Sequence, residues 1–198
     1  MKKNIKKEKL GFHIVLLGQI AAGKDTQALF LLEKYNFIPV ESGKYWRKKE
    51  KEKSAEGDLA RRTVSLGKPA PVALMKKFLI SQIENCPKGK NLLFVGNPRL
   101  KPEGQLLKKL LTERKENFFV LYITLPEKEI YKRSFGRSRG SDDSRAFIYN
   151  RIKWHKDQVS RTIEYFESLG KVKRIKGNQK ILEVASDIEG VIQSFKIK

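Results

Sequence analysis

Five short stretches carry apolar residues in nearly unbroken runs, and they predict the strands of a buried sheet. The strongest are residues 12–17 (Phe-His-Ile-Val-Leu-Leu), 91–95 (Asn-Leu-Leu-Phe-Val) and 118–125 (Phe-Phe-Val-Leu-Tyr-Ile-Thr-Leu); shorter runs lie at 37–41 and 172–175. Strands that are apolar throughout are typical of parallel sheets covered by helices on both faces.

Between these runs, apolar residues recur at helical spacing, as Ala28, Leu29, Leu31 and Leu32 do after the first strand. Gly67 ends one such pattern, and Asp142 or Asp143 is expected to cap the long helix of the last third. The pattern predicts helices over residues 26–35, 45–53, 59–66, 72–84, 104–115, 127–135, 143 to about 156, 159–169 and 181–195.

Strands that alternate with helices predict an α/β fold with a mostly parallel sheet, and no repeat or long linker divides the chain. Ligands of such sheets bind at the carboxyl ends of the strands. That edge gathers four loops that carry glycine or cationic residues: 18–26, 42–43, 96–99 and 136–141. The sequence therefore predicts a site for a polyanion.

The composition allows one sizeable domain, because 39% of the 198 residues are hydrophobic. No apolar run approaches the roughly 20 residues that span a bilayer, and the Lys-rich start is not followed by a signal-peptide pattern. A single cysteine, Cys86, cannot form an internal disulfide. We therefore expect a cytoplasmic protein.

The formal net charge of +21 favours anionic ligands. The lysines are scattered along the whole chain, which is typical of a solvated exterior and not of a nucleic-acid-binding stripe. Nucleic acid is therefore not the expected partner, and the arginines are the better candidates for function because a guanidinium binds phosphate oxygens in pairs.

The most informative loop runs from Gly18 to Thr26, between the first strand and the first helix. Its two glycines, Gly18 and Gly23, let backbone N–H groups point at phosphate oxygens, and the helix N-terminus and Lys24 add positive charge. Strand, glycine-rich turn and helix form the context in which this motif binds phosphate. Asp25 separates Lys24 from the hydroxyl of Thr26, so the hydroxyl is displaced by one residue.

The chain resembles the adenylate kinases, within the nucleoside monophosphate kinases of the P-loop NTPase superfamily, along nearly its whole length. Gly23-Lys24-Asp25-Thr26-Gln27 is similar to that family's phosphate-binding loop, with Asp25 in place of a second Gly. Residues 40–47 are similar to the monophosphate-binding segment, residues 67–71 to the stretch whose backbone meets the acceptor adenine, and residues 96–99 to a Gly-Phe-Pro-Arg motif with Asn97 for Phe.

The arginines of the last third extend the resemblance. Arg133 and Arg137, four residues apart, match the pair that opens the family's lid, and Arg151 follows Asp143 by eight residues, as at the lid's end. Arg139 corresponds to the remaining lid arginine, one position earlier than the family spacing. Five motifs in the right order make the resemblance specific.

The resemblance implies a three-layer α/β/α P-loop kinase fold with a mostly parallel five-stranded sheet, an AMP-binding helical segment and a minimal lid. It implies one domain, with a core of residues 10–40, 88–132 and 142–198, a monophosphate-binding segment at about 41–72 and a reduced lid at about 133–142. It implies the reversible reaction ATP + AMP = 2 ADP, with Mg²⁺ as cofactor and no structural zinc.

The resemblance also assigns site residues. The ATP site would comprise Gly18, Ala21, Ala22, Gly23, Lys24, Asp25, Thr26, Arg133 and Arg137. The AMP site would comprise Ser42, Gly43, Arg47, Lys68, Ala70, Gly96, Arg99, Gln105, Arg139 and Arg151. Lys24, Arg99, Arg133, Arg137, Arg139 and Arg151 would be catalytic, by surrounding the phosphoryl group in flight.

Two carboxylates that help to place the metal in the family are absent, because their positions hold Lys44 and Val95. Thr26 remains as a metal ligand, and our hypothesis is that Asp25 replaces one carboxylate, acting through water. The family's base-reading glutamine falls at Glu103; a two-residue insertion would assign its role to Gln105.

Only four residues separate Arg137 from Asp142, too few for the family's usual lid. Less lid means less exclusion of water, unless a neighbouring subunit covers the site. We therefore expect a homo-oligomer, with a trimer as one form.

Two other functions stay open at this point. One is a kinase of UMP, CMP or another monophosphate on the same fold. The other, from a different class, is a nucleic-acid-binding or non-catalytic nucleotide-binding protein, which the net charge and Val95 favour.

Overall fold

The computed structural model describes residues 7–135 and 145–196. Within them lies one five-stranded sheet in the order β2-β3-β1-β4-β5, and every neighbouring pair is parallel. The strands are β1 (Phe12–Gly18), β2 (Phe37–Val40), β3 (Asn91–Val95), β4 (Asn117–Thr124) and β5 (Val172–Lys176). All five predicted strands, and the α/β class, are confirmed.

The strand β1 is central because it pairs with β3 on one side and with β4 on the other. Leu16 lies opposite Val95 of β3 and Leu121 of β4, and Gly18 lies opposite Ile123. The phosphate-binding loop therefore leaves the middle of the sheet at its carboxyl edge.

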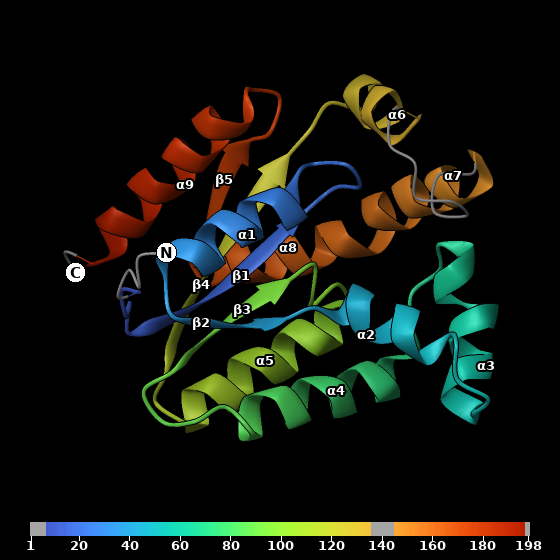
Figure 1. Cartoon of the computed structure of the whole chain (residues 1–198), viewed down its shortest axis with the longest axis horizontal. Helices are drawn as coiled ribbons and strands as arrows, with labels where there is room; N and C mark the ends of the chain where they lie inside the picture. The colour runs from blue at the N-terminus through green and yellow to red at the C-terminus, as the bar shows by residue number, and fades with distance from the viewer. Residues whose placement is uncertain (1–6, 136–144, 197–198) are drawn as a thin grey trace, which may run out of the picture.

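Helices cover both faces of the sheet, which gives the three layers predicted from the sequence (Figure 1). One face carries α1 (Lys24–Lys34) and α9 (Ile181–Lys196), and the other carries α4 (Val72–Glu84), α5 (Lys101–Glu113) and α8 (Ser160–Ser168). The alternation of side chains along each strand supplies both layers: Ile14 and Leu16 pack towards α1 and α9, whereas Val15 and Leu17 pack towards α4 and α5.

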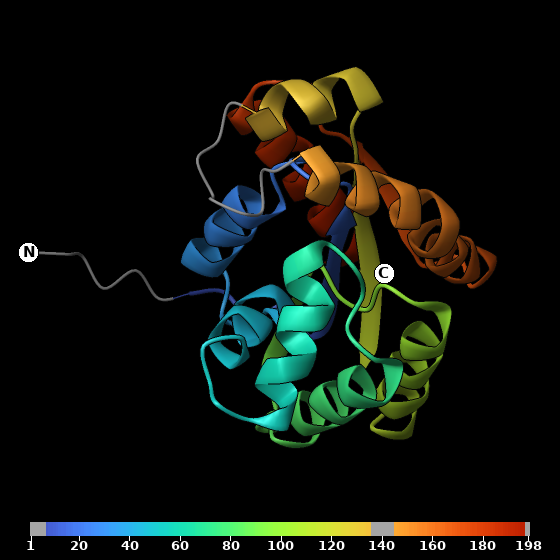
Figure 2. The ribbon, with the colours of Figure 1, turned by 90° about the vertical axis from the view of Figure 1, so that its right-hand side faces the viewer.

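The remaining helices lie beyond the carboxyl ends of the strands (Figures 1 and 2). They are α2 (Ser42–Lys49), α3 (Ala55–Arg62), α6 (Glu127–Phe135) and α7 (Arg145–Trp154), with a 3-10 turn at Val64–Leu66. Figure 2 views this end of the molecule, with α2 and α3 on one side and α6 and α7 on the other.

Several helix boundaries differ from the prediction, each for a local reason. The helices α2 and α3 begin earlier than predicted, at Ser42 and Ala55, and the start of α3 is capped by Ser54, whose Oγ accepts from Gly57 N at 3.1 Å. The helix α5 begins at Lys101 because Pro102 is tolerated in a first turn. The helix α7 continues through a π-helical stretch, His155–Val159, into α8.

Asp142 and Asp143, expected as the cap of α7, lie outside the described residues. Among residues 7–135 and 145–196, no helix combines the length and the apolar character needed to cross a bilayer.

Candidate active site

One large cavity, of about 770 Å³, opens at the carboxyl edge of the sheet. Segments far apart in the sequence line it: the loop after β1, the start of α2, the stretch around Lys68, the turn after β3, and helices α6 and α7. The sequence predicted this edge as a polyanion site, and the fold brings together every part of it that lies in the described residues.

The phosphate-binding loop is tightly wound around its glycines. Gly18 has φ 155°, and a Cβ there would lie 2.5 Å from the carbonyl oxygen of Ile123, so β1 meets β4 too closely for a side chain. Gly23, at φ 85°, makes the left-handed turn into α1. The Lys24 ammonium donates to the carbonyl oxygens of Gly18 at 2.9 Å and Gln19 at 2.6 Å, which holds its charge inside the loop.

Residues Ala21 to Thr26 all line the large cavity, whereas Gly18 lines a second, smaller cavity of about 20 Å³ directly beneath the loop. Lys24, Arg99 and Arg151 border both cavities. The smaller cavity has room for about one water molecule. The two cavities therefore adjoin one another at these three cationic side chains.

The turn after β3 is built around a cis peptide bond between Asn97 and Pro98. Asn97 is fully buried, and its Nδ2 donates to the carbonyl oxygens of Val40 at 2.8 Å and Val95 at 3.2 Å, which joins the ends of β2 and β3. Arg99 then folds back, with its Nε donating to the carbonyl oxygen of Gly96. Burial lowers the pKa of Arg99, while the nearby carboxylates of Glu103 and Asp25 oppose that change.

Glu103, and not Gln105, faces the cavity. The helix α5 starts at Lys101, and position 103 points inwards, where Glu103 is only 1% exposed; Gln105 is exposed and does not line the cavity. Two positions further along a helix is roughly 200° around it. Gln105, predicted for the AMP site, therefore does not reach the cavity, and Glu103 occupies the inward position.

Glu103 is held by the backbone of its own first turn. Its Oε2 accepts hydrogen bonds from Arg99 N at 2.8 Å and Leu100 N at 3.3 Å. Burial raises the pKa of Glu103, against the opposing effects of these two bonds and of the Arg99 charge. Among the described residues, no hydrogen bond reaches its other carboxylate oxygen, Oε1, so Oε1 is the atom that this side chain offers to a ligand.

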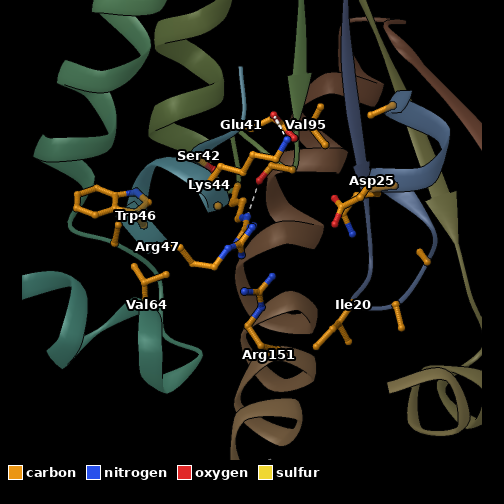
Figure 3. A pocket seen from close by; sticks show the side chains of 18 of the residues that line it. Ile20, Asp25, Glu41, Ser42, Lys44, Trp46, Arg47, Val64, Val95 and Arg151 are labelled. Atoms are coloured by element: carbon orange, nitrogen blue, oxygen red, sulfur yellow. Dashed lines mark hydrogen bonds and ion pairs between the residues drawn. The ribbon is translucent and has the colours of Figure 1, made fainter. Parts of the chain in front are cut away.

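The cavity is lined, as predicted, by Ser42, Gly43, Arg47, Lys68 and Ala70. Lys44, at the position of a family carboxylate, pairs with Glu41 at 2.7 Å (Figure 3). This ion pair offsets the charge of the carboxylate next to Ser42 in the chain, while Glu50 and Glu103 also line the cavity.

Arg47 from α2 and Arg151 from α7 both point into the cavity (Figure 3). Arg133, from α6, also lines it, and pairs with Glu129 one turn earlier at 3.7 Å. Arg137 and Arg139 lie outside the described residues. Four of the six predicted arginines are thus placed at the cavity, counting Arg99 with these three.

Asp25 and Thr26 occupy adjacent positions in the first turn of α1, and both line the cavity. A carboxylate and a hydroxyl oxygen are ligands that Mg²⁺ accepts, usually with several waters retained. These residues therefore fit a hydrated Mg²⁺ ion that arrives with a nucleotide. Among the described residues there is no group of three or more His, Cys, Asp or Glu side chains that could hold a metal ion.

Two aromatic residues of the site, Trp154 and His155, were not predicted from the sequence. They follow Arg151 by three and four positions, and on a helix these spacings share one face, which is the signal that could have identified them. The His155 ring stacks on Tyr122 with 6.0 Å between centroids. Burial, and then the charges of Lys24, Arg151 and Arg99, lower the pKa of His155 to about 3, so it is neutral in the site.

Comparison with known proteins identifies similar chains. The family model described as adenylate kinase matches residues 16–171. The chain is 27% identical over 180 residues to an adenylate kinase of Azobacteroides pseudotrichonymphae, covering 89% of this chain and 94% of the relative. It is 30% identical over 169 residues to an adenylate kinase of Bacteroides fragilis, with 83% and 89% covered. An adenylate kinase of Parabacteroides distasonis is 27% identical over 188 residues, with 93% and 99% covered.

Proposed function

The chain belongs to the adenylate kinase family, and we propose that it catalyses the reversible, Mg²⁺-dependent transfer of a phosphoryl group from ATP to AMP, giving two ADP. One observation carries this proposal. A single cavity joins the phosphate-binding loop to the acceptor-side segment, and arginines from four separate segments line it.

The donor nucleotide would place its β- and γ-phosphates in the loop from Gly18 to Thr26. Loop N–H groups and the N-terminus of α1 favour negative charge there. The Lys24 ammonium, held by two loop carbonyls at 2.6 and 2.9 Å, is positioned at the same point. Phosphate oxygens would compete for its protons. Arg133, on α6 above the loop, would contact the ATP side.

The acceptor would enter from the segment of residues 41–72. Arg47 and Arg99 would bind the AMP phosphate, and Ser42, Gly43, Lys68 and Ala70 would surround the nucleoside. The buried Glu103 would face the base through Oε1. The arginines Arg137 and Arg139 keep their proposed roles around the transferred group.

Transfer itself needs positioning and charge neutralisation more than covalent help. An oxygen of the AMP phosphate forms a bond to the γ-phosphorus of ATP, the bond from that phosphorus to the bridging oxygen breaks, and the electron pair leaves with the ADP product. No proton has to be removed from an already ionised phosphate. Arg99 and Arg151 offset the charge that spreads over the transferred group.

Mg²⁺, when bound with ATP, supplies further neutralisation of the phosphate charge. We propose that Thr26 holds it and that Asp25 helps through a bound water. Both side chains line the cavity on the side of the phosphate-binding loop.

We further propose that the chain is one domain, with its core in residues 10–40, 88–132 and 142–198, an acceptor segment at about 41–72 and a reduced lid at about 133–142.

The single cysteine of the chain supports a cytoplasmic location. Only four residues separate Arg137 from Asp142, and this short stretch is the reason to expect a homo-oligomer, such as a trimer, in which a neighbour covers the site. Sedimentation that shows a fully active monomer would contradict the oligomer.

The experiment that tests the function is an acceptor panel. The protein is incubated with ATP, Mg²⁺ and AMP, GMP, CMP or UMP in parallel, and ADP formation is measured. We expect AMP to be the best acceptor. A preference for CMP or UMP would assign a pyrimidine monophosphate kinase instead. If none of the four monophosphates accepts a phosphoryl group, and the protein binds a polynucleotide with an affinity that falls steeply as salt rises, the nucleic-acid-binding alternative is favoured.

A further inference from the structure

Trp154 lies where three parts of the site meet. It is the last residue of α7, and it lines the 20 Å³ cavity beneath the phosphate-binding loop together with Lys24, Arg99 and Arg151. Its contacts show how it acts on other residues.

Two guanidinium groups lie over the indole ring of Trp154. The Cζ atom of Arg99 lies over it at 5.8 Å from the ring centroid, and that of Arg151 at 5.6 Å. Two like charges that share one small region repel each other, and Arg99 is further penalised by burial. The negative face of an indole attracts guanidinium groups, and attracts them most where water is excluded. Trp154 therefore offsets part of the repulsion between the two arginines.

The edge of the same ring binds the acceptor segment. Its Nε1–H donates to the carbonyl oxygen of Gly67 at 2.7 Å, and Asn150, one turn earlier, donates to the carbonyl oxygen of Leu66 at 3.2 Å. Gly67 packs so closely on α7 that a Cβ there would lie 3.0 Å from the carbonyl oxygen of Phe147. The turn Val64–Gly67 is thus fixed to α7, on the face that also carries Arg151.

We propose that Trp154 is a positioning residue for phosphoryl transfer: it holds Arg99 and Arg151 together before nucleotides bind and fixes the acceptor segment relative to them. This inference rests on the proposed function, because it assigns the two arginines to the transferred group. Trp154 acts through the arginines and the Gly67 carbonyl, and it needs no contact with the substrate. Groups that are positioned in advance avoid a reorganisation cost during the reaction.

Two substitutions separate the face of the ring from its edge. Trp154→Phe keeps an aromatic face for the guanidinium groups but removes the N–H donor to Gly67. Trp154→Leu removes both. Tyr149→Leu is the matched control, because Tyr149 is an aromatic residue on the same helix that is 60% exposed. Thermal unfolding of each variant shows that it is folded under the assay conditions.

For each protein, kcat and the KM for AMP are measured, and AMP affinity is measured by calorimetry. For Trp154→Phe we expect KM to rise roughly 2- to 10-fold, the range that one lost hydrogen bond supports, with kcat within about 2-fold of the wild type. For Trp154→Leu we expect kcat to fall by about 10-fold or more, together with weaker AMP binding. Tyr149→Leu should match the wild type.

A Trp154→Leu variant that is folded and keeps both wild-type kcat and wild-type AMP affinity would overturn the inference. So would equal losses of kcat in the Phe and Leu variants, since they would show that the aromatic face has no role. A wild type that binds AMP but transfers no phosphoryl group would count against the proposed function alone. In that case the calorimetric comparison of wild type with Trp154→Leu still decides whether Trp154 positions the arginines.

Discussion

Glu103→Gln changes one atom that faces the cavity and leaves the shape of the side chain unchanged. In the wild type, Oε2 accepts from Arg99 N at 2.8 Å and from Leu100 N at 3.3 Å. An NH₂ group cannot accept hydrogen bonds, so the amide oxygen of Gln must take this place. The amide nitrogen then replaces Oε1, and the group offered to the base changes from an acceptor to a donor.

The effect depends on the edge of the base. Guanine presents two adjacent N–H donors, which suit a carboxylate oxygen, whereas adenine presents an amino donor beside a ring nitrogen that can accept from the amide. A hydrogen bond to a charged group contributes about 1.5–3 kcal/mol, which corresponds to roughly 10- to 100-fold. We therefore expect the ratio of kcat/KM for AMP to that for GMP to rise by about 10-fold or more in Glu103→Gln. The ratio cancels any change in folding or in desolvation that both acceptors share.

The pH dependence supplies a second measurement on the same variant. Burial raises the pKa of Glu103 above the usual 4.5, so the folded chain holds this proton more tightly than the unfolded chain. Stability is therefore lost as pH rises from about 4.5 through the raised pKa, and Glu103→Gln removes this loss. The variant should gain melting temperature relative to the wild type as pH rises to 7.

Glu113→Gln is the matched control, because Glu113 lies at the far end of the same helix, where its side chain is 57% exposed. It should change neither the acceptor ratio nor the pH dependence of melting. The reasoning about Oε1 is refuted if Glu103→Gln, active on AMP, keeps the wild-type ratio of AMP to GMP. If the melting temperatures of Glu103→Gln and the wild type differ by the same amount at every pH, the explanation by titration of Glu103 is wrong, and the prediction for the acceptor ratio is unaffected.

Three further substitutions test other parts of the structure. Asp25→Gly should weaken the Mg²⁺ dependence of turnover, and an unchanged metal titration would remove Asp25 from the proposed metal site. Because burial lowers the pKa of His155 to about 3, the wild type should lose stability as pH falls from 6.5 towards 3. Urea unfolding of His155→Gln at several pH values should show a smaller loss, and an equal loss would mean that other groups cause it. Gly67→Ala should cost about 1–3 kcal/mol, since Gly67 has φ 73° and a Cβ would lie 3.0 Å from the Phe147 carbonyl oxygen. Gly89→Ala, at φ 75° with nothing within 4 Å, is its control, and equal costs in urea would show that packing on α7 contributes nothing.

The sequence by itself determined the sheet and the phosphate-binding loop, because both depend on neighbours in the chain. A buried parallel strand needs apolar residues on both faces, so the runs at 12–17, 91–95 and 118–125 were visible without any structure. The loop from Gly18 to Thr26 needs glycines at fixed positions between a strand and a helix, and that spacing is local too.

Helix boundaries, and the residue of α5 that faces the cavity, were harder to predict, because they depend on where a helix begins. The start of α5 at Lys101 places Glu103 inwards and Gln105 outwards, because two positions along a helix lie roughly 200° apart. Arg99 was predicted from its motif, but its folded-back position follows from the turn after β3 and the bond to Gly96.

Only the tertiary structure decided the role of Trp154. Its partners, Gly67 and Arg99, are 87 and 55 positions away in the chain, and no local pattern connects them. Charge repulsion between arginines and its relief by an aromatic face depend on distances of a few ångströms, which the packing of α7 against two other segments sets. The sequence supplied the charged groups of the site, and the fold decided which of them share a partner.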